Sequence, residues 1–144
     1  LVDTAKLSTL LGISRTTLLA YLEYLDEAKL IRRLYSDDLS VKKMQKPDKI
    51  LMDNCNLLKV LALKEPNIGT LRETFFCNQL GYQHQVEYSK QGDFLIDHQI
   101  TFEIGGQAKE GKQVAAVENA YIVADDIEYS YGNKLPIWLF GLLY

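Results

Sequence analysis

Two acidic residues, Asp93 and Glu103, stand at the ends of a segment whose pattern predicts a β-hairpin. The segment has the sequence D-F-L-I-D-H-Q-I-T-F-E-I, in which two alternating apolar runs flank a polar centre. A three-residue loop at 97–99 places Phe94 across from Phe102, whereas a two-residue loop would set apolar residues against polar ones. The pattern therefore predicts a hairpin with Asp93 directly opposite Glu103.

Two carboxylates facing each other across a strand pair repel, and a bound cation or a shared proton relieves that repulsion. Carboxylate pairs with an open side are also the ligands that hold Mg²⁺ for phosphodiester hydrolysis. Asp93 and Glu103 are therefore candidate metal ligands. The alternative is a hairpin whose polar face simply meets water.

The elements around this hairpin predict an α/β fold. Segments 49–52, 86–89 and 119–124 have strand character, and apolar spacing predicts helices after Asp53-Asn54 and over 70–80. Glu73 lies in the second of these helices, as a further candidate acid or as a solvated position. The run G-Q-A-K-E-G-K has the spacing of a phosphate-binding loop, but it lacks the final Ser or Thr and is interpreted as an ordinary loop. His84 and His98 are interpreted as ordinary surface residues.

The first part of the chain has the pattern of a winged helix-turn-helix. A helix over 2–11 ends at Gly12, Ser14 caps a second helix, and a short strand over 29–35 follows.

Such a fold predicts DNA contacts at two places. Arg15, Thr16 and Thr17 occupy the first turn of the second helix, where base-contacting residues project. Lys42 and Lys43, in the wing, could contact phosphates. The second helix also carries three acids, Glu23, Asp26 and Glu27, which would repel DNA phosphates. The alternative is a winged helix that packs on another domain.

Composition and charge exclude several classes of protein. With 47% hydrophobic and 24% charged residues, the chain is too apolar for a disordered protein. No apolar run reaches the ~18 residues of a membrane span. The 144 residues carry a net charge of -3, and the excess of acid lies in the second half, which suggests two modules.

Two widely spaced cysteines fit a reducing cytoplasm. A start at Leu1 without Met or signal peptide leads us to expect the tail of a longer polypeptide.

Several motifs resemble one prokaryotic family. Residues 3–25 (D-T-A-K-L-S-T-L-L-G-I-S-R-T-T-L-L-A-Y-L-E-Y-L) resemble the winged helix that follows the ATPase core of predicted AAA-type ATPases. The C-terminal domain of that family, which is related to the PD-(D/E)xK restriction-endonuclease-like fold, is similar to four further segments. These segments are K-I-L-M-D-N (49–54), G-T-L-R-E-T-F-F (69–76), G-D-F-L-I-D (92–97) and F-E-I-G-G (102–106).

The resemblance implies a set of site residues. Glu73 matches the helical acid of the family, and Asp93 and Glu103 match its two metal-binding acids, which would hold Mg²⁺. The lysine that should stand two positions after the second acid is Gly105 here. Lys109 or Lys112 would have to take its place, because that lysine stabilises the attacking water and the transition-state charge. The resemblance thus implies a degenerate nuclease-like site.

The expected architecture is a winged helix over 1–48 and a restriction-endonuclease-like mixed-sheet domain over 49–144. The expected function is the C-terminal regulatory and interaction region of a predicted AAA-type ATP-binding protein. Its partner would be the upstream ATPase domain of the same polypeptide, which alone would bind ATP and through which oligomers could form. We expect no membrane contact. The alternatives are a Mg²⁺-dependent nuclease acting on DNA and a winged-helix DNA-binding regulator.

Overall fold

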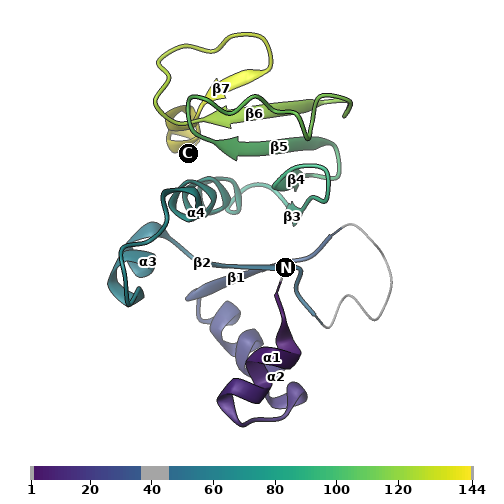
Figure 1. The fold of residues 1–144 in the computed structure, drawn as a ribbon, viewed down its shortest axis with the longest axis vertical. Coiled ribbons are helices and arrows are strands. Elements are labelled where there is room, and N and C mark those ends of the chain that lie inside the picture. The colour runs from purple at the N-terminus through teal and green to yellow at the C-terminus, as the bar shows by residue number, and fades with distance from the viewer. Residues whose placement is uncertain (1, 37–45, 144) are drawn as a thin grey trace.

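The computed structural model describes residues 2–36 and 46–143 and has an α/β architecture (Figure 1). Helices α1 (Thr4–Leu11) and α2 (Arg15–Glu27) lie at one end, beside a two-stranded antiparallel ribbon of β1 (Ile31–Leu34) and β2 (Lys49–Met52). Helices α3 (Cys55–Leu61) and α4 (Ile68–Leu80) follow. A five-stranded mixed sheet and a short 3₁₀ helix complete the fold: β3 (Val86–Tyr88), β4 (Phe94–Ile96), β5 (Ile100–Gly105), β6 (Ala120–Ala124), β7 (Lys134–Pro136) and η1 (Ile137–Leu142).

The predicted helix-turn-helix is present with its predicted end signals. Gly12 adopts a left-handed conformation with φ of 66° and ends α1, while the Ser14 side chain accepts the N–H of Thr17 and begins α2. The buried side of α2 presents Leu18 and Leu22 to Ile31 of β1. A small apolar core therefore holds the two helices on the ribbon.

The ribbon alternates its side chains between two cores. Ile31 and Ile50 pack toward α2, whereas Leu34 and Leu51 belong to the large core of α4 and the sheet. This alternation follows from the period of two along a strand. The strand β2, which begins the predicted second domain, is therefore paired with the winged-helix strand β1.

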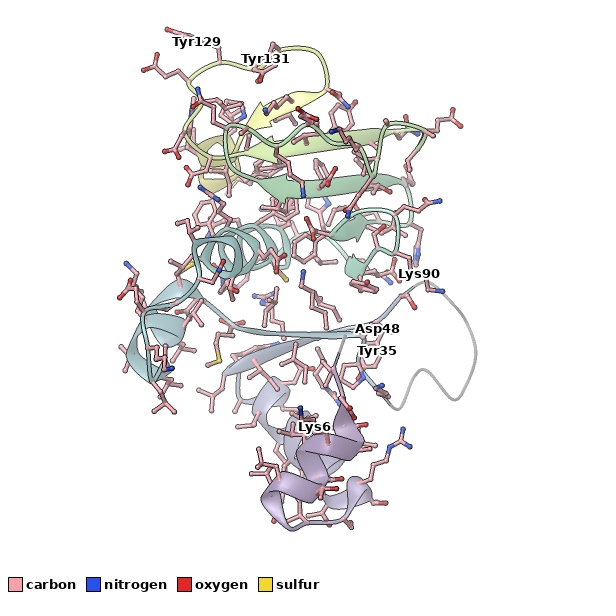
Figure 2. The ribbon with its side chains drawn as sticks, viewed as in Figure 1. Lys6, Tyr35, Asp48, Lys90, Tyr129 and Tyr131 are labelled. Carbon is pink, nitrogen blue, oxygen red and sulfur yellow. The ribbon has the colours of Figure 1, made fainter. Side chains whose placement is uncertain are left out.

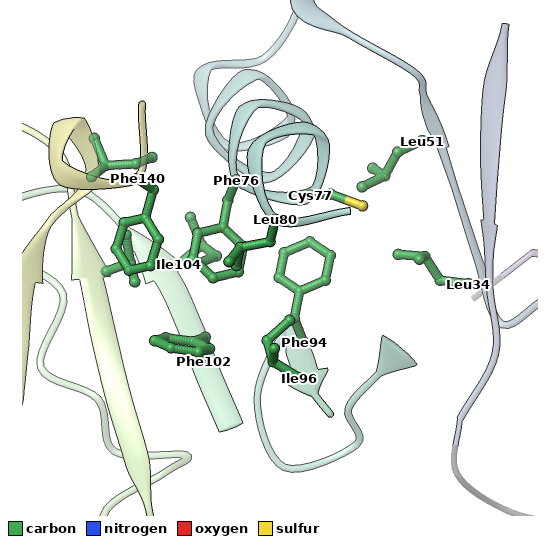
Figure 3. Close-up of a cluster of buried hydrophobic side chains, with 12 residues drawn as sticks. Leu34, Leu51, Phe76, Cys77, Leu80, Phe94, Ile96, Phe102, Ile104 and Phe140 are labelled. Carbon is green, nitrogen blue, oxygen red and sulfur yellow. The ribbon is translucent and has the colours of Figure 1, made fainter. Parts of the chain in front are cut away.

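The large core lies between α4 and one face of the five-stranded sheet (Figure 3). Its centre is Phe76 of α4, whose ring centroid lies 5.4 Å from that of Phe94, 5.1 Å from Phe102 and 4.8 Å from Phe140. Cys77 lies beside it on the same helix, and its burial raises the pKa of its thiol to about 11.

The sheet order is β3-β4-β5-β6-β7, with antiparallel pairs at the β3 edge and parallel pairs from β5 onward. Residues 106–119, all of which the structure describes, connect β5 to β6 and form no helix or strand. Val114 of this connection packs with Ala120 and Ile122 of β6 in a smaller cluster on the second face of the sheet.

Two apolar segments are buried only in part. The helix predicted after Asp53-Asn54 is present as α3, but none of its residues is fully buried. In the apolar C-terminal segment, Ile137 and Phe140 are buried, whereas Trp138 and Leu142 are more than half exposed. Both segments lie at the periphery, where only one side meets a neighbour.

Candidate functional site

The hairpin that carries Asp93 and Glu103 has the predicted register. Phe94 pairs with Phe102 and Ile96 with Ile100, so the connection is the three residues 97–99. Asp97 and His98 have φ of 51° and 58°, and the N–H of Gln99 donates to the carbonyl of Ile96 at 2.9 Å. Two positive φ angles at the centre of this turn match the right-handed twist of the flanking strands.

Asp93 lies one residue beyond the paired part of β4 and bonds to the neighbouring strand. Its backbone N–H donates to the carbonyl of Phe102 at 2.8 Å, and its Oδ2 accepts the N–H of Ile104 at 2.7 Å. The Asp93 side chain thus satisfies the edge of β5 where β4 has ended. One of its two oxygens is committed to the backbone next to Glu103.

Glu73 and Asp93 share a lysine that the sequence pattern did not single out. The Nζ of Lys49 lies 2.8 Å from Glu73 Oε2 and 3.9 Å from Asp93 Oδ1. It also lies 5.0 Å from the ring centroid of Phe94, so apolar surface bounds it on another side. The structure therefore joins a helical acid and a hairpin acid through an ammonium group from β2.

Glu103 points to the face of the sheet opposite α4 and is almost completely buried, with 1% of its surface exposed. Its Oε1 forms an ion pair with Lys109 Nζ at 2.9 Å. Its Oε2 is buried without a hydrogen-bond partner among the described residues. A carboxylate in this position is costly unless it is paired, so Lys109 is its principal stabiliser.

Gly105 and Lys109 are complementary in space. A Cβ added at Gly105 would lie within 2.9 Å of three carbons of the Lys109 side chain. The Lys109 stem therefore crosses the backbone where the side chain of residue 105 would begin. A lysine is absent two positions after Glu103, but a lysine from the following loop reaches the same carboxylate.

A second lysine holds that loop in place. Lys134 of β7 is 7% exposed, and its Nζ donates to the carbonyls of Gln107 at 2.6 Å and Lys109 at 3.0 Å. It also lies 5.5 Å from the ring centroid of Tyr131, which is near the outer end of the molecule (Figure 2). Backbone carbonyls and an aromatic face replace the lost water around this ammonium.

The loop and Glu103 line an open cavity of about 320 Å³. Lys109 and Lys112 contribute to its wall, and Lys112 also pairs with Glu110 at 2.6 Å. The cavity is thus lined by charged side chains of both signs. These charged groups suit a small polar ligand.

The arrangement does not fit a Mg²⁺ ion as it stands. Mg²⁺ requires oxygen ligands in near-octahedral geometry. Within residues 2–36 and 46–143, no group of three or more His, Cys, Asp or Glu side chains is placed to hold a metal. Lys49 lies against Glu73 and near Asp93, and Lys109 is paired with Glu103. Ammonium groups therefore supply the positive charge that a metal would otherwise bring.

The two histidines lie near the turn of the hairpin. His84 Nδ1 lies 2.7 Å from Asp97 Oδ2, and His98 Nδ1 lies 2.9 Å from Glu87 Oε2. The hydrogen bond from His84, followed by that from the backbone of Gln85, lowers the pKa of Asp97. These pairs hold the turn.

The predicted DNA-contacting residues lie at the start of α2. Arg15 and Thr16 are exposed, and Thr17 bonds to Ser14, with 2.8 Å between their hydroxyl oxygens. Lys42 and Lys43 fall outside the described residues.

The rest of the helix pair presents a different surface. Large apolar or aromatic side chains are exposed on α1 and α2, and we call them the winged-helix apolar patch; they are Leu10, Leu11, Tyr21, Tyr24 and Leu25. Glu23 and Glu27 are exposed on the same helix as the last three.

The two lysines that sequence reasoning missed differ in how they could have been found. Lys49 stands two residues before Leu51 in β2, so the two side chains share one face and the inward direction of Lys49 was implicit in the strand pattern. Lys134 gave no comparable signal, because its partners are backbone carbonyls of a loop far earlier in the chain.

Comparison with known families identifies the first part of the chain. Residues 2–35 match the family described as elongation factor SelB, winged helix. The match covers α1, α2 and β1, so the N-terminal part is a winged helix. Searches of curated proteins and of solved structures find no match. Within the described ranges, no helix has the length and apolar character needed to cross a membrane.

Proposed function

We propose that this chain is the regulatory and interaction region of a larger ATP-binding protein, and that its winged helix contacts protein rather than DNA. The winged-helix apolar patch carries the proposal. Leu10 is 79% exposed, Tyr24 63% and Tyr21 52%. Large apolar and aromatic side chains exposed among polar residues are typical of a protein-binding face.

Charge supports the same choice. A DNA-binding surface gains most of its affinity from Lys and Arg that neutralise phosphates. Helix α2 carries one base, Arg15, against Glu23, Asp26 and Glu27. Asp26 is itself paired with Arg33 of β1 at 3.0 Å, which removes that guanidinium from the surface available to phosphate.

The resemblance to predicted AAA-type ATPases supplies the partner. In this proposal the winged-helix apolar patch packs on an upstream ATPase domain of the same polypeptide, which alone binds ATP and through which oligomers form. The nuclease-like domain is degenerate, and the protein acts in the cytoplasm. The nucleotide state of the upstream domain would then change how the winged helix is held.

The coding sequence before Leu1 provides the first test. A Walker motif there is expected, and its absence would contradict the proposed partner. The second test mixes the polypeptide encoded upstream with this chain and measures association by analytical ultracentrifugation. Tyr24→Ser should weaken association at least tenfold. The control is Tyr129→Ser, at an exposed tyrosine at the opposite end of the molecule (Figure 2), which should leave association unchanged. Salt-dependent duplex DNA binding that Arg15→Glu abolishes would instead favour a DNA-binding regulator.

A second candidate function is a nuclease, and the ion pair between Lys109 and Glu103 favours it. Lys109 supplies an ammonium at the acid where the expected lysine is missing, and such a group can stabilise charge that develops on a phosphate. The test is incubation with plasmid DNA and Mg²⁺ or Mn²⁺. Cutting that Asp93→Ala and Lys109→Met both abolish would support it. No cutting, or cutting unchanged by Asp93→Ala, would exclude it.

A further inference from the structure

The ribbon formed by β1 and β2, which we call the winged-helix ribbon, carries Lys49. Among the described residues, Lys49 is the one side chain of this ribbon that forms ion pairs with acids of both α4 and the hairpin. Its Nζ lies 2.8 Å from Glu73 Oε2 and 3.9 Å from Asp93 Oδ1. The side chains of all three residues are less than a quarter exposed. Water therefore screens this group of charges only in part.

The direction of Lys49 is set by the strand that carries it. β2 pairs with β1 in a continuous register, in which Lys49 stands opposite Leu34. Leu34 and Leu51, on the same side of the ribbon, are buried in the core under α4. Lys49 must consequently point toward α4 and the hairpin as long as the ribbon stays docked there.

Two carboxylates that converge on one point without a cation would repel each other. The Lys49 ammonium stands at that point and is bonded to Glu73. A divalent cation bound by the same two carboxylates would need the same space, because its oxygen ligands lie within about 2.6 Å. The ammonium and a divalent cation therefore exclude each other.

We propose that the ammonium of Lys49, which the winged-helix ribbon places between Glu73 and Asp93, occupies the position of a divalent cation and prevents such cations from binding these acids. This inference accounts for the misfit with Mg²⁺ described above and bears on the second candidate function. A divalent cation gains access only when the Lys49 ammonium leaves its place between the two carboxylates.

The test measures Mn²⁺ binding to the whole chain by isothermal titration calorimetry and by the electron paramagnetic resonance signal of free Mn²⁺. Lys49→Met should tighten Mn²⁺ binding by at least about tenfold, because it removes a positive charge that lies within 4 Å of both acids. Lys49→Arg keeps the charge and should leave the binding as weak as in the unchanged protein. Lys59→Met removes an equal charge from the exposed side of α3 and is the matched control.

A second variant establishes which acids bind. Adding Glu73→Gln or Asp93→Asn to Lys49→Met should reverse the gain. Lys49→Gln provides a polar substitute if Lys49→Met does not fold, as judged by circular dichroism. Equal Mn²⁺ affinity in the unchanged protein and in Lys49→Met would overturn the role of Lys49 while leaving a metal site possible. Undetectable binding in both at millimolar Mn²⁺ would overturn the inference and also the metal-dependent nuclease.

Discussion

The two faces of the five-stranded sheet are built on different principles. The face under α4 is covered by a helix and filled with aromatic rings around Phe76. The opposite face is covered by the irregular segment 106–119, under which lie Glu103 and Lys134, both less than a tenth exposed. A helix satisfies its own backbone groups and can press apolar side chains on a sheet, whereas a loop leaves carbonyls that need donors. Buried charge is therefore found under the loop.

The largest effect should come from the aromatic face. Phe76→Ala removes a ring in contact with three others and should lower the free energy of unfolding by about 3–5 kcal/mol. Urea denaturation followed by tryptophan fluorescence of Trp138 measures it. Phe75→Ala, at a partly buried neighbour on the same helix, should cost clearly less. Equal losses for the two variants would contradict the placement of Phe76 at the centre of the core.

A smaller effect is expected on the loop-covered face from Lys109→Met. This substitution leaves the Glu103 carboxylate buried without its counter-ion, and because Lys109 is partly exposed we expect a loss of about 2–3 kcal/mol. The double variant Glu103→Gln with Lys109→Met should be more stable than Lys109→Met alone. Additive losses in a double-mutant cycle of urea midpoints would show that the two side chains do not interact.

Loss of the tether that holds the loop should have a more local effect. Lys134→Met removes the donor to the carbonyls of Gln107 and Lys109 and should cost about 2 kcal/mol, within the range for charged hydrogen bonds. Amide hydrogen exchange should rise over 106–113 and stay unchanged in α4. Faster exchange throughout the protein would instead indicate a general loss of stability.

The smallest effect concerns Cys77, which α4 buries in the large core. Its folded pKa of about 11 exceeds the ordinary thiol value, so the folded state holds the proton more tightly than the unfolded state. Its contribution to stability is complete below pH 9 and is lost as the pH rises toward 11. Between pH 8 and pH 10 the loss should be about 1.4 kcal/mol, as one pKa unit corresponds to about that amount. Cys77→Ala should show a correspondingly flatter dependence of stability on pH, whereas an identical dependence would contradict the burial of the thiol.

Cys55, which is only partly buried, should be alkylated before Cys77 at pH 8.

Regular patterns made part of this structure predictable. The hairpin register followed from alternation, because a shift by one residue would have turned Phe94 and Phe102 out of the core. Gly12 and Ser14 marked helix ends because their local conformations are few. Asp93 and Glu103 were singled out by their positions in the hairpin, and Glu73 by its place in a helix and by the resemblance; their roles remain predictions.

Contacts between segments far apart in the chain were predicted only in part. Lys109 reaches Glu103 only because its loop is held by Lys134, and no local pattern encodes the path of that loop. Lys49 meets Glu73 because the ribbon docks on α4, which depends on the packing of Leu34 and Leu51 rather than on periodicity. Sequence reasoning thus found the acids and, through the resemblance, named Lys109, but it missed Lys49, the counter-ion of Glu73 and Asp93.

The two-sided ribbon has a consequence for how this molecule can be divided. Leu34 in β1 and Leu51 in β2 complete the core under α4, while Ile31 and Ile50 on their reverse side complete the core under α2. A fragment that starts at Lys49 would retain one strand with an unpaired edge and lose Leu34 from its interior. Denaturation of either half should therefore disrupt the other, so that calorimetry of the whole chain records a single cooperative transition.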